Sequence, residues 1–400
     1  MSAGVGERRT PTRLREVEAA LARAHALVAA YDAELRRELP PDVDVFDAHT
    51  HLGTDIDGMV GRREELLDVF DRYGVSGGFV FCLDEPDRDP AFRAANDRTL
   101  AHAEEAGGRL VPFVRLDLAG PDPIVEAVRC LDRGAAGIKL HPRAQKFMLT
   151  DERLAPVFAL AEARRVPILI HGGRGLPPIA DDLARLIERY PETQLIVAHA
   201  GIADMAGLAG RLGRKAGVFF DTSVWSALDL LDLFRLVAPE QVVYASDYPY
   251  GSQPSMLLNA VRTAKRAGYS LTQLRELLAG NAKRILAGEP PVEPTHPTGA
   301  ESFAQPLTFA RIHQYLSMAT PLIWTRQPDT VGVLGLALNA TEERNGYRRE
   351  TKQIRELLLA ARDVWRTLPD VEDEAELIQT GRAASRLIHL ADILAVTAVP

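Results

Sequence analysis

Residues 45–51 read VFDAHTH and place ionisable side chains at every second position of a short apolar run. Seven similar apolar runs follow, separated by stretches with helical periodicity. They begin at residues 78, 110, 137, 167, 195, 218 and 242. Strands that alternate with helices along a chain are typical of a parallel sheet. Eight strand–helix units in about 250 residues match the size of a closed (β/α)₈ TIM barrel, with a doubly wound open sheet as the competing architecture.

The sequence on either side of these runs predicts helices. Residues 1–43 contain an amphipathic helix over residues 12–38, and residues 44–288 would form the barrel. The proline-rich stretch 289–302 is expected to be a linker. Residues 303–400 are expected to be an all-helical extension that serves as a lid or in oligomerisation. Within this extension, helices are predicted over residues 303–318, 349–367 and 373–396, and a strand-like pattern occupies residues 331–338.

The composition is that of an ordinary globular protein. The 400 residues are 46% hydrophobic and 26% charged, which excludes intrinsic disorder and fibrous structure. A net charge of −8 opposes binding to a phosphate backbone, so no nucleic-acid partner is expected. The sequence has neither an apolar run long enough to span a membrane nor a signal-peptide start. Cys82 and Cys130 lie in apolar stretches and are predicted to be buried, reduced thiols, so we expect a cytoplasmic protein with no membrane partner.

Ionisable side chains gather where the predicted strands end. Because side chains along a strand have period two, Asp47, His49 and His51 are expected to project to one side. Three later runs end in His171, His199 and Asp247. The active site of a barrel lies at the carboxyl ends of its strands, so these side chains are predicted to meet there.

Histidine nitrogens and a carboxylate oxygen form a ligand set for a catalytic divalent ion such as zinc. A bound ion can lower the pKa of its water from about 15.7 to about 7. Asp247 would then accept the proton, and His199 would orient or polarise the reacting group. A single histidine at a strand end is usually a hydrogen-bonded core or surface residue, so this prediction depends on the whole set. The charge-rich stretch 84–89 is expected to be a solvated loop.

Six motifs resemble those of the amidohydrolase superfamily, in particular the branch that includes aminocarboxymuconate-semialdehyde decarboxylase and its hydrolase relatives. The resemblance covers residues 44–287. The motifs are FDAHTH at 46–51, GIKLHP at 137–142, IHGG at 170–173, AHAG at 198–201, ASDYP at 245–249 and GNAKRIL at 280–286. The resemblance implies that His49, His51, His171 and Asp247 hold one divalent ion, zinc or manganese. It also implies that His199 lies beside the ion and contacts the water or substrate.

Lys139 bears on the number of ions. In binuclear members of the superfamily, a carboxylated lysine on the fourth strand bridges two ions, whereas the GIKLHP pattern resembles the mononuclear branch. There the lysine stays an ammonium or contacts an acidic substrate. His141 shares the predicted face of Lys139 and Arg143 follows, so the three are candidates to bind a substrate carboxylate. The alternatives are an ion pair of Lys139 with Asp47 or Asp221, a His141 side chain that is satisfied by the backbone, and a solvated loop position for Arg143.

The leading functional hypothesis is a metal-dependent hydrolase that cleaves a C–N or C–O bond, in an amide, lactone or ester. Its substrate would be a small molecule, with carboxylated molecules among the candidates. A non-oxidative decarboxylase of an aromatic or unsaturated acid is the second hypothesis. A catalytically silent barrel with a binding role in the helical tail is the third. An apolar stripe over residues 350–367 must be covered, either by packing on the barrel or in a homo-oligomer.

Overall fold

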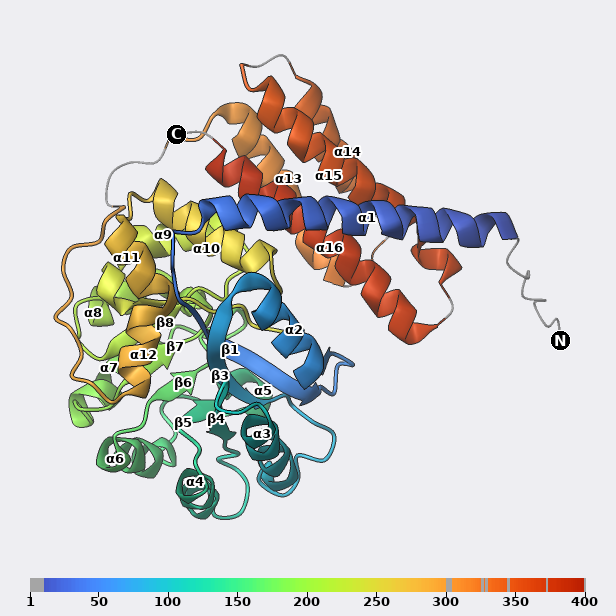
Figure 1. Ribbon diagram of the computed structural model, residues 1–400. Helices are drawn as coiled ribbons and strands as arrows, with labels where there is room; N and C mark the ends of the chain where they lie inside the picture. The colour runs from blue at the N-terminus through green and yellow to red at the C-terminus, as the bar shows by residue number, and fades with distance from the viewer. Residues whose placement is uncertain are drawn as a thin grey trace. The chain divides into compact units, whose positions relative to one another are not determined.

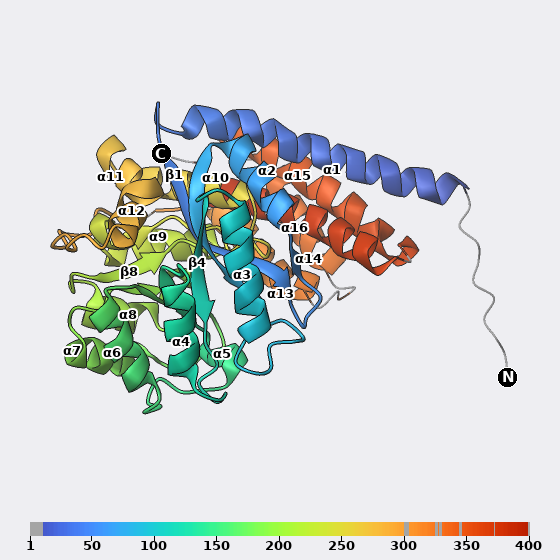
Figure 2. The same cartoon turned by 60° about the horizontal axis from the view of Figure 1, so that its bottom comes forward.

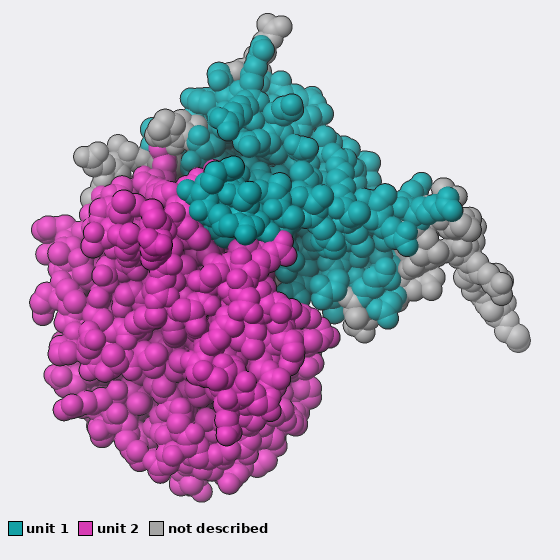
Figure 3. Space-filling view, viewed as in Figure 1, with its two compact units in different colours: residues 1–37, 302–400 teal, residues 38–301 magenta. Residues whose placement is uncertain are grey.

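The computed structural model describes residues 11–299, 304–324, 327, 330–343, 346–371 and 373–398. Contacts divide the chain into two compact units, shown in Figure 3. The barrel unit comprises Glu38–Glu301, and the helical unit comprises Met1–Arg37 and Ser302–Pro400. The N-terminal helix therefore groups with the C-terminal helices, and the proline-rich stretch groups with the barrel.

The barrel unit contains a nine-stranded sheet in the order β2-β1-β3-β4-β5-β6-β7-β8-β9 (Figure 1). Eight strands pair in parallel, and β2 (Val60–Gly61) pairs antiparallel with the end of β1. The parallel strands are β1 (Val45–Thr54), β3 (Val75–Cys82), β4 (Leu110–Arg115), β5 (Gly137–Leu140), β6 (Ile168–Ile170), β7 (Leu195–Val197), β8 (Val218–Asp221) and β9 (Val242–Val243). Each of the eight predicted apolar runs forms one of these strands.

Backbone hydrogen bonds close the sheet on itself. The amide of Ala48 in β1 donates to Tyr244 O at 2.9 Å, and the amide of His51 donates to Tyr248 O at 2.7 Å. In the other direction, the amide of Asp247 donates to His49 O at 2.9 Å. The first strand therefore pairs with the segment that continues β9. The predicted (β/α)₈ barrel is confirmed, and the open sheet, whose outer strands would stay unpaired, is wrong.

Helices surround the barrel strands, as Figures 1 and 2 show from two directions. The α-helices are α2 (Arg63–Tyr73), α3 (Arg93–Glu105), α4 (Pro123–Asp132), α5 (Pro142–Gln145), α6 (Leu154–Arg164), α7 (Ala180–Arg189), α8 (Met205–Leu212), α9 (Ala227–Leu236), α10 (Ser255–Arg266), α11 (Leu271–Arg275) and α12 (Asn281–Leu286). Short 3₁₀-helices are η1 (His199–Gly201) and η2 (Pro239–Gln241), and a π-helix is η3 (Glu276–Gly280). In α7 the buried residues are Ala180, Leu183, Ala184 and Ile187, the spacing of one helical face.

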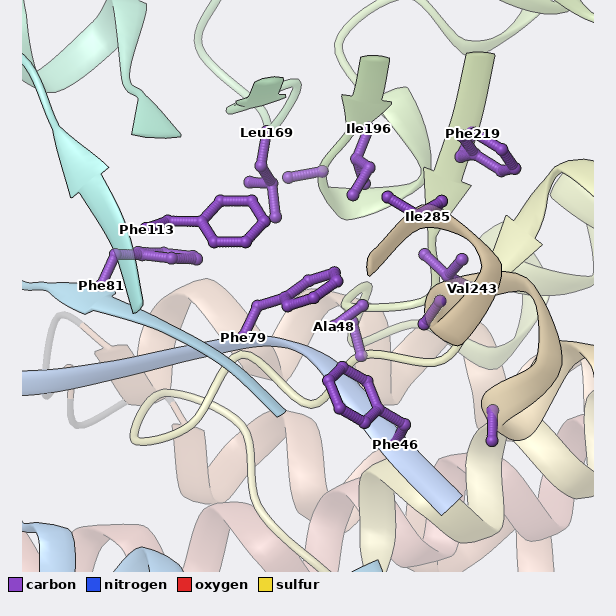
Figure 4. Close-up of a cluster of buried hydrophobic side chains, with 14 residues drawn as sticks. Phe46, Ala48, Phe79, Phe81, Phe113, Leu169, Ile196, Phe219, Val243 and Ile285 are labelled. Carbon is purple, nitrogen blue, oxygen red and sulfur yellow. The ribbon is translucent and has the colours of Figure 1, made fainter. Parts of the chain in front are cut away.

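A cluster of buried apolar side chains lies among the strands of the barrel unit (Figure 4). The rings of Phe79 and Phe113 are tilted by 34° with centroids 4.6 Å apart, and Phe46 meets Phe79 edge-on at 5.1 Å. Ile285 of α12 belongs to the same cluster, so the last helix of the unit packs against the strands. Burying a phenylalanine stabilises a fold by about 1.5 to 3 kcal/mol, so this cluster contributes substantially to the stability of the barrel unit.

The helical unit consists of α1 (Pro11–Glu38), α13 (Leu307–Trp324), α14 (Thr330–Glu342), α15 (Arg348–Thr367), the 3₁₀-helix η4 (Leu368–Asp370) and α16 (Glu374–Thr397). The strand-like interpretation of residues 331–338 is wrong, because they lie in α14. The buried residues Leu334, Ala337, Leu338 and Thr341 have helical spacing, and this outweighs the strand preference of the valines there. The apolar stripe of α15 is buried, and α15 contacts both α14 and α16.

Two further observations concern the cysteines and the search for membrane-spanning helices. Cys82 and Cys130 are buried, free thiols, as predicted. Among the helices of the described ranges, none has the length and apolar character needed to cross a membrane.

Candidate metal centre

Two histidines of β1 and an aspartate just beyond β9 bring three ligand atoms together. His49 Nε2 lies 3.1 Å from His51 Nε2 and 3.3 Å from Asp247 Oδ1. His51 Nε2 lies 3.2 Å from the same Asp247 oxygen. Together these side chains form a group that could hold a metal ion. The structure therefore unites three of the four predicted metal ligands.

The spacing of these atoms fits a tetrahedral ion. Zinc binds imidazole nitrogen at about 2.0 to 2.1 Å, so neighbouring ligand atoms in a tetrahedral site lie about 3.3 Å apart. The separations of 3.1 to 3.3 Å agree with that value. Burial lowers the pKa of His51 and lowers the pKa of His49 well below its usual range. Burial therefore favours the neutral form of both imidazoles, which is the form that binds a metal.

Asp221, at the end of β8, orients His49. Its Oδ2 lies 2.7 Å from His49 Nδ1, and its side chain is fully buried. A carboxylate accepts hydrogen bonds, so His49 carries its hydrogen on Nδ1 and presents the Nε2 lone pair to the cluster. Asp221 Oδ1 also accepts from the backbone amide of His199 at 2.7 Å and from Ser223 Oγ at 2.5 Å. The sequence indicated Asp221 only as an ion-pair candidate; its position at a strand end was the signal for a role in the site.

Asp247 is the member of the cluster that solvent reaches most. Its side chain is 17% exposed, compared with 0% for His49 and 7% for His51. Burial raises the pKa of Asp247, but the neighbouring imidazoles of His199, His51 and His49 outweigh burial and hold that pKa below its usual value. Asp247 is therefore an ionised, accessible carboxylate.

His199, which begins η1 just beyond the end of β7, lies beside the cluster. Its ring centroid is 5.1 Å from that of His49. Its Nδ1 lies 2.9 Å from Ser223 O, so this nitrogen donates to the carbonyl and leaves Nε2 with a lone pair. His199 and Asp247 both have a φ of 57°, in the left-handed region. A non-glycine residue in this region costs about 1 to 3 kcal/mol, and such residues are frequent at functional sites.

His171, the fourth predicted ligand, lies next to His199 but outside the three-atom cluster. The ring centroids of His171 and His199 are 4.6 Å apart. His171 Nε2 is buried and has no hydrogen-bond partner within the described ranges. A Cβ on Gly173 would lie 2.7 Å from His171 Nε2 and 3.1 Å from Cδ2 of His199, so glycine keeps the space beside this nitrogen free. An unsatisfied nitrogen facing a protected space fits a ligand position.

Lys139 lies inside the barrel rather than on its surface. The residue is 1% exposed, and its Nζ lies 4.5 Å from the centroid of the Phe81 ring. In the part of the chain that the structure describes, this Nζ makes no hydrogen bond, so the proposed ion pair with Asp47 or Asp221 is wrong. Burial lowers the pKa of Lys139 to about 7, although the charges of Asp221 and Asp247 act to raise it.

Asp47 is also buried, but it is not a member of the cluster. Its Oδ1 accepts from the backbone amides of His49 at 3.2 Å and Ser246 at 2.9 Å. The pairing of β1 with β3 has a register irregularity between Asp47 and Thr50, so the simple alternation of the sequence pattern is interrupted here. Asp47 therefore holds the backbone of the two segments that carry the ligands.

The other two predicted substrate contacts lie after β5. His141 Nδ1 accepts from the amide of Ala144 at 3.2 Å, and its ring stacks on His171 with centroids 3.9 Å apart. Arg143 is exposed, and its Nη1 donates to the backbone oxygen of Arg174 at 3.4 Å. The structure therefore places His141 beside the centre and Arg143 at the surface.

The loop after β3 differs from its prediction. Asp84 and Glu85 are 7% and 6% exposed, so the expectation of a solvated loop is wrong for these two residues. Nη2 of Arg98 lies 2.5 Å from Glu85 Oε2, and Nη2 of Arg115 lies 3.7 Å from Asp84 Oδ1. Buried carboxylates are usually paired, and these arginines supply the partners. Arg115, which ends β4, was not singled out by the sequence.

Comparisons with known proteins agree with this geometry. The model of a family described as amidohydrolase, Amidohydro_2, matches residues 46–287. Among solved structures, the chain resembles IDCase from Metarhizium anisopliae with 15% identity and a TM-score of 0.51, over 62% of this chain and 98% of that one. This likeness supports the barrel fold. A search of curated proteins found no match.

Two further solved structures are similar. One is an amidohydrolase from Burkholderia multivorans with bound zinc, with 16% identity and a TM-score of 0.49 over 61% of this chain and 99% of that one. The other is 5-carboxyvanillate decarboxylase LigW from Sphingomonas paucimobilis, with 18% identity and a TM-score of 0.47 over 62% of this chain and 99% of that one.

Proposed function

Because the chain belongs to the amidohydrolase family, we propose that it is a metal-dependent hydrolase that cleaves a C–N or C–O bond of a small molecule. The bond would belong to an amide, a lactone or an ester. The observation that carries this proposal is the cluster of His49, His51 and Asp247, whose ligand atoms are 3.1 to 3.3 Å apart. We propose His171 as a further ligand of one divalent ion, zinc or, as an alternative, manganese.

A divalent ion held there would supply an activated water at neutral pH, because it lowers the pKa of water from 15.7 to about 7. Asp247 accepts a proton on its carboxylate, which is ionised and the most exposed of the cluster. It then returns the proton to the leaving group. His199 is held at Nδ1 by Ser223 O, so its Nε2, on the opposite edge of the ring, contacts the water or the substrate carbonyl. Asp221 keeps the His49 lone pair directed at the cluster.

Decarboxylation of an aromatic or unsaturated acid is the second candidate. It is favoured by the buried Nζ of Lys139, which has no hydrogen-bond partner in the described structure and suits an acidic substrate. The same ligand set would serve this reaction. Release of carbon dioxide, measured with each converted substrate, separates a decarboxylase from a hydrolase.

The first test is the metal content of the chain. Purified protein is supplied with zinc or manganese, dialysed, and analysed for ions per chain alongside a His49→Ala, His51→Ala double variant. A matched control replaces two exposed histidines instead, His25→Ala and His296→Ala. The proposal predicts about one ion per chain in the wild type and the control, and none in the double variant.

The other outcomes count against the proposal. Two ions per chain would contradict the one-ion site and place Lys139 among the ligands. No ion in the wild type would overturn the metal-dependent mechanism and favour a silent barrel. Once a substrate is found among amides, lactones and carboxylated aromatics, Asp247→Asn must lose most of its turnover; unchanged turnover would remove Asp247 as the base.

A further inference from the structure

A serine, a histidine and an aspartate form a hydrogen-bonded row in the helical unit. They belong to α13 and α16, which contact each other (Figure 1). His313 Nδ1 lies 2.6 Å from Asp392 Oδ1, and Ser317 Oγ lies 3.4 Å from His313 Nε2. The candidate metal ligands all belong to the barrel unit, so this row is a separate group of reactive side chains.

Asp392 sets the tautomer of His313. The Asp392 side chain is 0% exposed, and a carboxylate accepts hydrogen bonds, so His313 carries its hydrogen on Nδ1. Within the described ranges, the second oxygen of Asp392, Oδ2, is buried and has no hydrogen-bond partner. Burying a carboxylate is costly unless it is paired, and the imidazole supplies the pairing. The lone pair of His313 therefore lies on Nε2, the nitrogen nearer to Ser317.

The three side chains become more exposed from the acid to the hydroxyl. The Asp392 side chain is fully buried, the His313 side chain is 12% exposed, and Ser317 belongs to the exposed residues. His313 and Ser317 are four residues apart, so they lie on the same face of α13. An oriented base beside an accessible hydroxyl is the arrangement that activates a serine as a nucleophile.

The hydroxyl of Ser317 does not follow the usual pattern of hydroxyls in helices. A serine or threonine inside a helix commonly donates to the carbonyl of the residue four positions earlier. In this unit, such bonds of 2.6 to 3.0 Å are made by Thr320, Thr380 and Thr397. Ser317 Oγ instead has the imidazole of His313 as its hydrogen-bond partner. Its hydroxyl is therefore directed at a base.

We propose that Ser317 is a nucleophile for activated acyl esters, with His313 as its base and Asp392 as the group that orients His313. Ser317 Oγ forms a bond to the acyl carbon, and the bond from that carbon to the leaving oxygen breaks. The hydroxyl proton moves to His313 Nε2 and then to the leaving oxygen. Water then hydrolyses the acyl-serine, with the same imidazole taking its proton and returning it to Ser317.

The distance of 3.4 Å from Ser317 Oγ to His313 Nε2 is long for a hydrogen bond to a hydroxyl. Catalytic hydrogen bonds are often long in a protein without substrate and shorten in the complex. This inference goes beyond the proposed function, because its chemistry uses neither the ion nor any residue of the barrel unit.

The test is covalent labelling of the full chain. Wild type, Ser317→Ala, His313→Gln and Asp392→Asn are treated with a fluorophosphonate or with p-nitrophenyl acetate, and modified peptides are identified by mass spectrometry. The controls, Ser76→Ala and His25→Gln, change exposed residues outside the row. We expect a label on Ser317 in the wild type and both controls. His313→Gln should label at least about 100-fold more slowly, which is the low end of the contribution of a positioned base.

Thermal melting verifies that each variant is folded. Because Asp392 is fully buried and its replacement can unfold the unit, the decisive comparison is between wild type and His313→Gln, whose changed side chain is partly exposed. A folded wild type without a label on Ser317 overturns the proposal, as does equal labelling of Ser317 in His313→Gln. A folded Asp392→Asn protein that labels at the wild-type rate refutes the role of Asp392. A chain that binds zinc but leaves Ser317 unlabelled refutes this inference and leaves the proposed function intact.

Discussion

Asp221→Asn tests whether a single buried carboxylate sets the chemistry of the metal centre. Asp221 is fully buried and accepts hydrogen bonds from His49 Nδ1 at 2.7 Å and from the amide of His199 at 2.7 Å. Asparagine has nearly the same shape but presents an amide donor in place of one oxygen. An amide that donates to His49 Nδ1 moves the imidazole hydrogen to Nε2, the atom that faces the cluster.

The expected loss follows from that change of tautomer. Replacing a hydrogen-bond partner of a metal-bound histidine typically weakens metal binding 10- to 100-fold, which corresponds to about 1.4 to 2.7 kcal/mol. Zinc affinity is measured by competition with a chromophoric chelator, with melting of the metal-free proteins to verify folding. The control, Asp132→Asn, removes a carboxylate whose side chain is 56% exposed and pairs with Arg164. If a folded Asp221→Asn protein binds zinc as tightly as the wild type, Asp221 does not orient His49.

Two further substitutions test the surroundings of the centre and of the barrel core. Gly173→Ala places a Cβ 2.7 Å from His171 Nε2, so it should weaken zinc binding while changing the melting temperature little; unchanged zinc affinity would remove His171 from the ligand set. Burial raises the pKa of Glu126, but hydrogen bonds from Arg129, Asn96 and Cys130 outweigh it and lower that pKa. The charged form is thus favoured in the folded state, and its stabilisation is present above the unfolded pKa of about 4.3 and is lost as the pH falls through the folded value. In urea unfolding, the free energy of unfolding of the wild type should exceed that of Glu126→Gln by more at pH 7 than at pH 3. An equal difference at the two pH values would show that the ionised form of Glu126 does not stabilise the fold.

Most of the fold and the core of the candidate site could be predicted from local patterns. The period of two in β1 joined His49 to His51, and the strand-end rule added Asp247, because parallel strands present their carboxyl ends at one edge. The first rule needs only residues that are close in the sequence, and the second needs only the general arrangement of a parallel sheet. The misassigned residues 331–338 show where local patterns fail, since valines that favour strands lie on a helix with a buried face.

The remaining parts of the site depend on contacts between distant strands. The role of Asp221 requires that β8 and β1 face each other inside the closed barrel, which spacing along the chain does not specify. Asp84 looked like part of a solvated loop because charged residues usually face water. Its Oδ1 lies 3.7 Å from Nη2 of Arg115, which comes from another strand and is a partner for the buried carboxylate. Partners of this kind follow from three-dimensional packing and not from periodicity.

The candidate ligands lie at opposite ends of the barrel sequence, because His49 and His51 belong to β1 and Asp247 follows β9. They are therefore synthesised at different times. Translation adds about 5 to 20 residues per second, so roughly 10 to 40 seconds pass between the synthesis of His51 and that of Asp247. A nascent chain in that interval offers two histidines without the carboxylate that completes the group. An ion captured at the full cluster therefore marks a chain whose first and last barrel strands have already met.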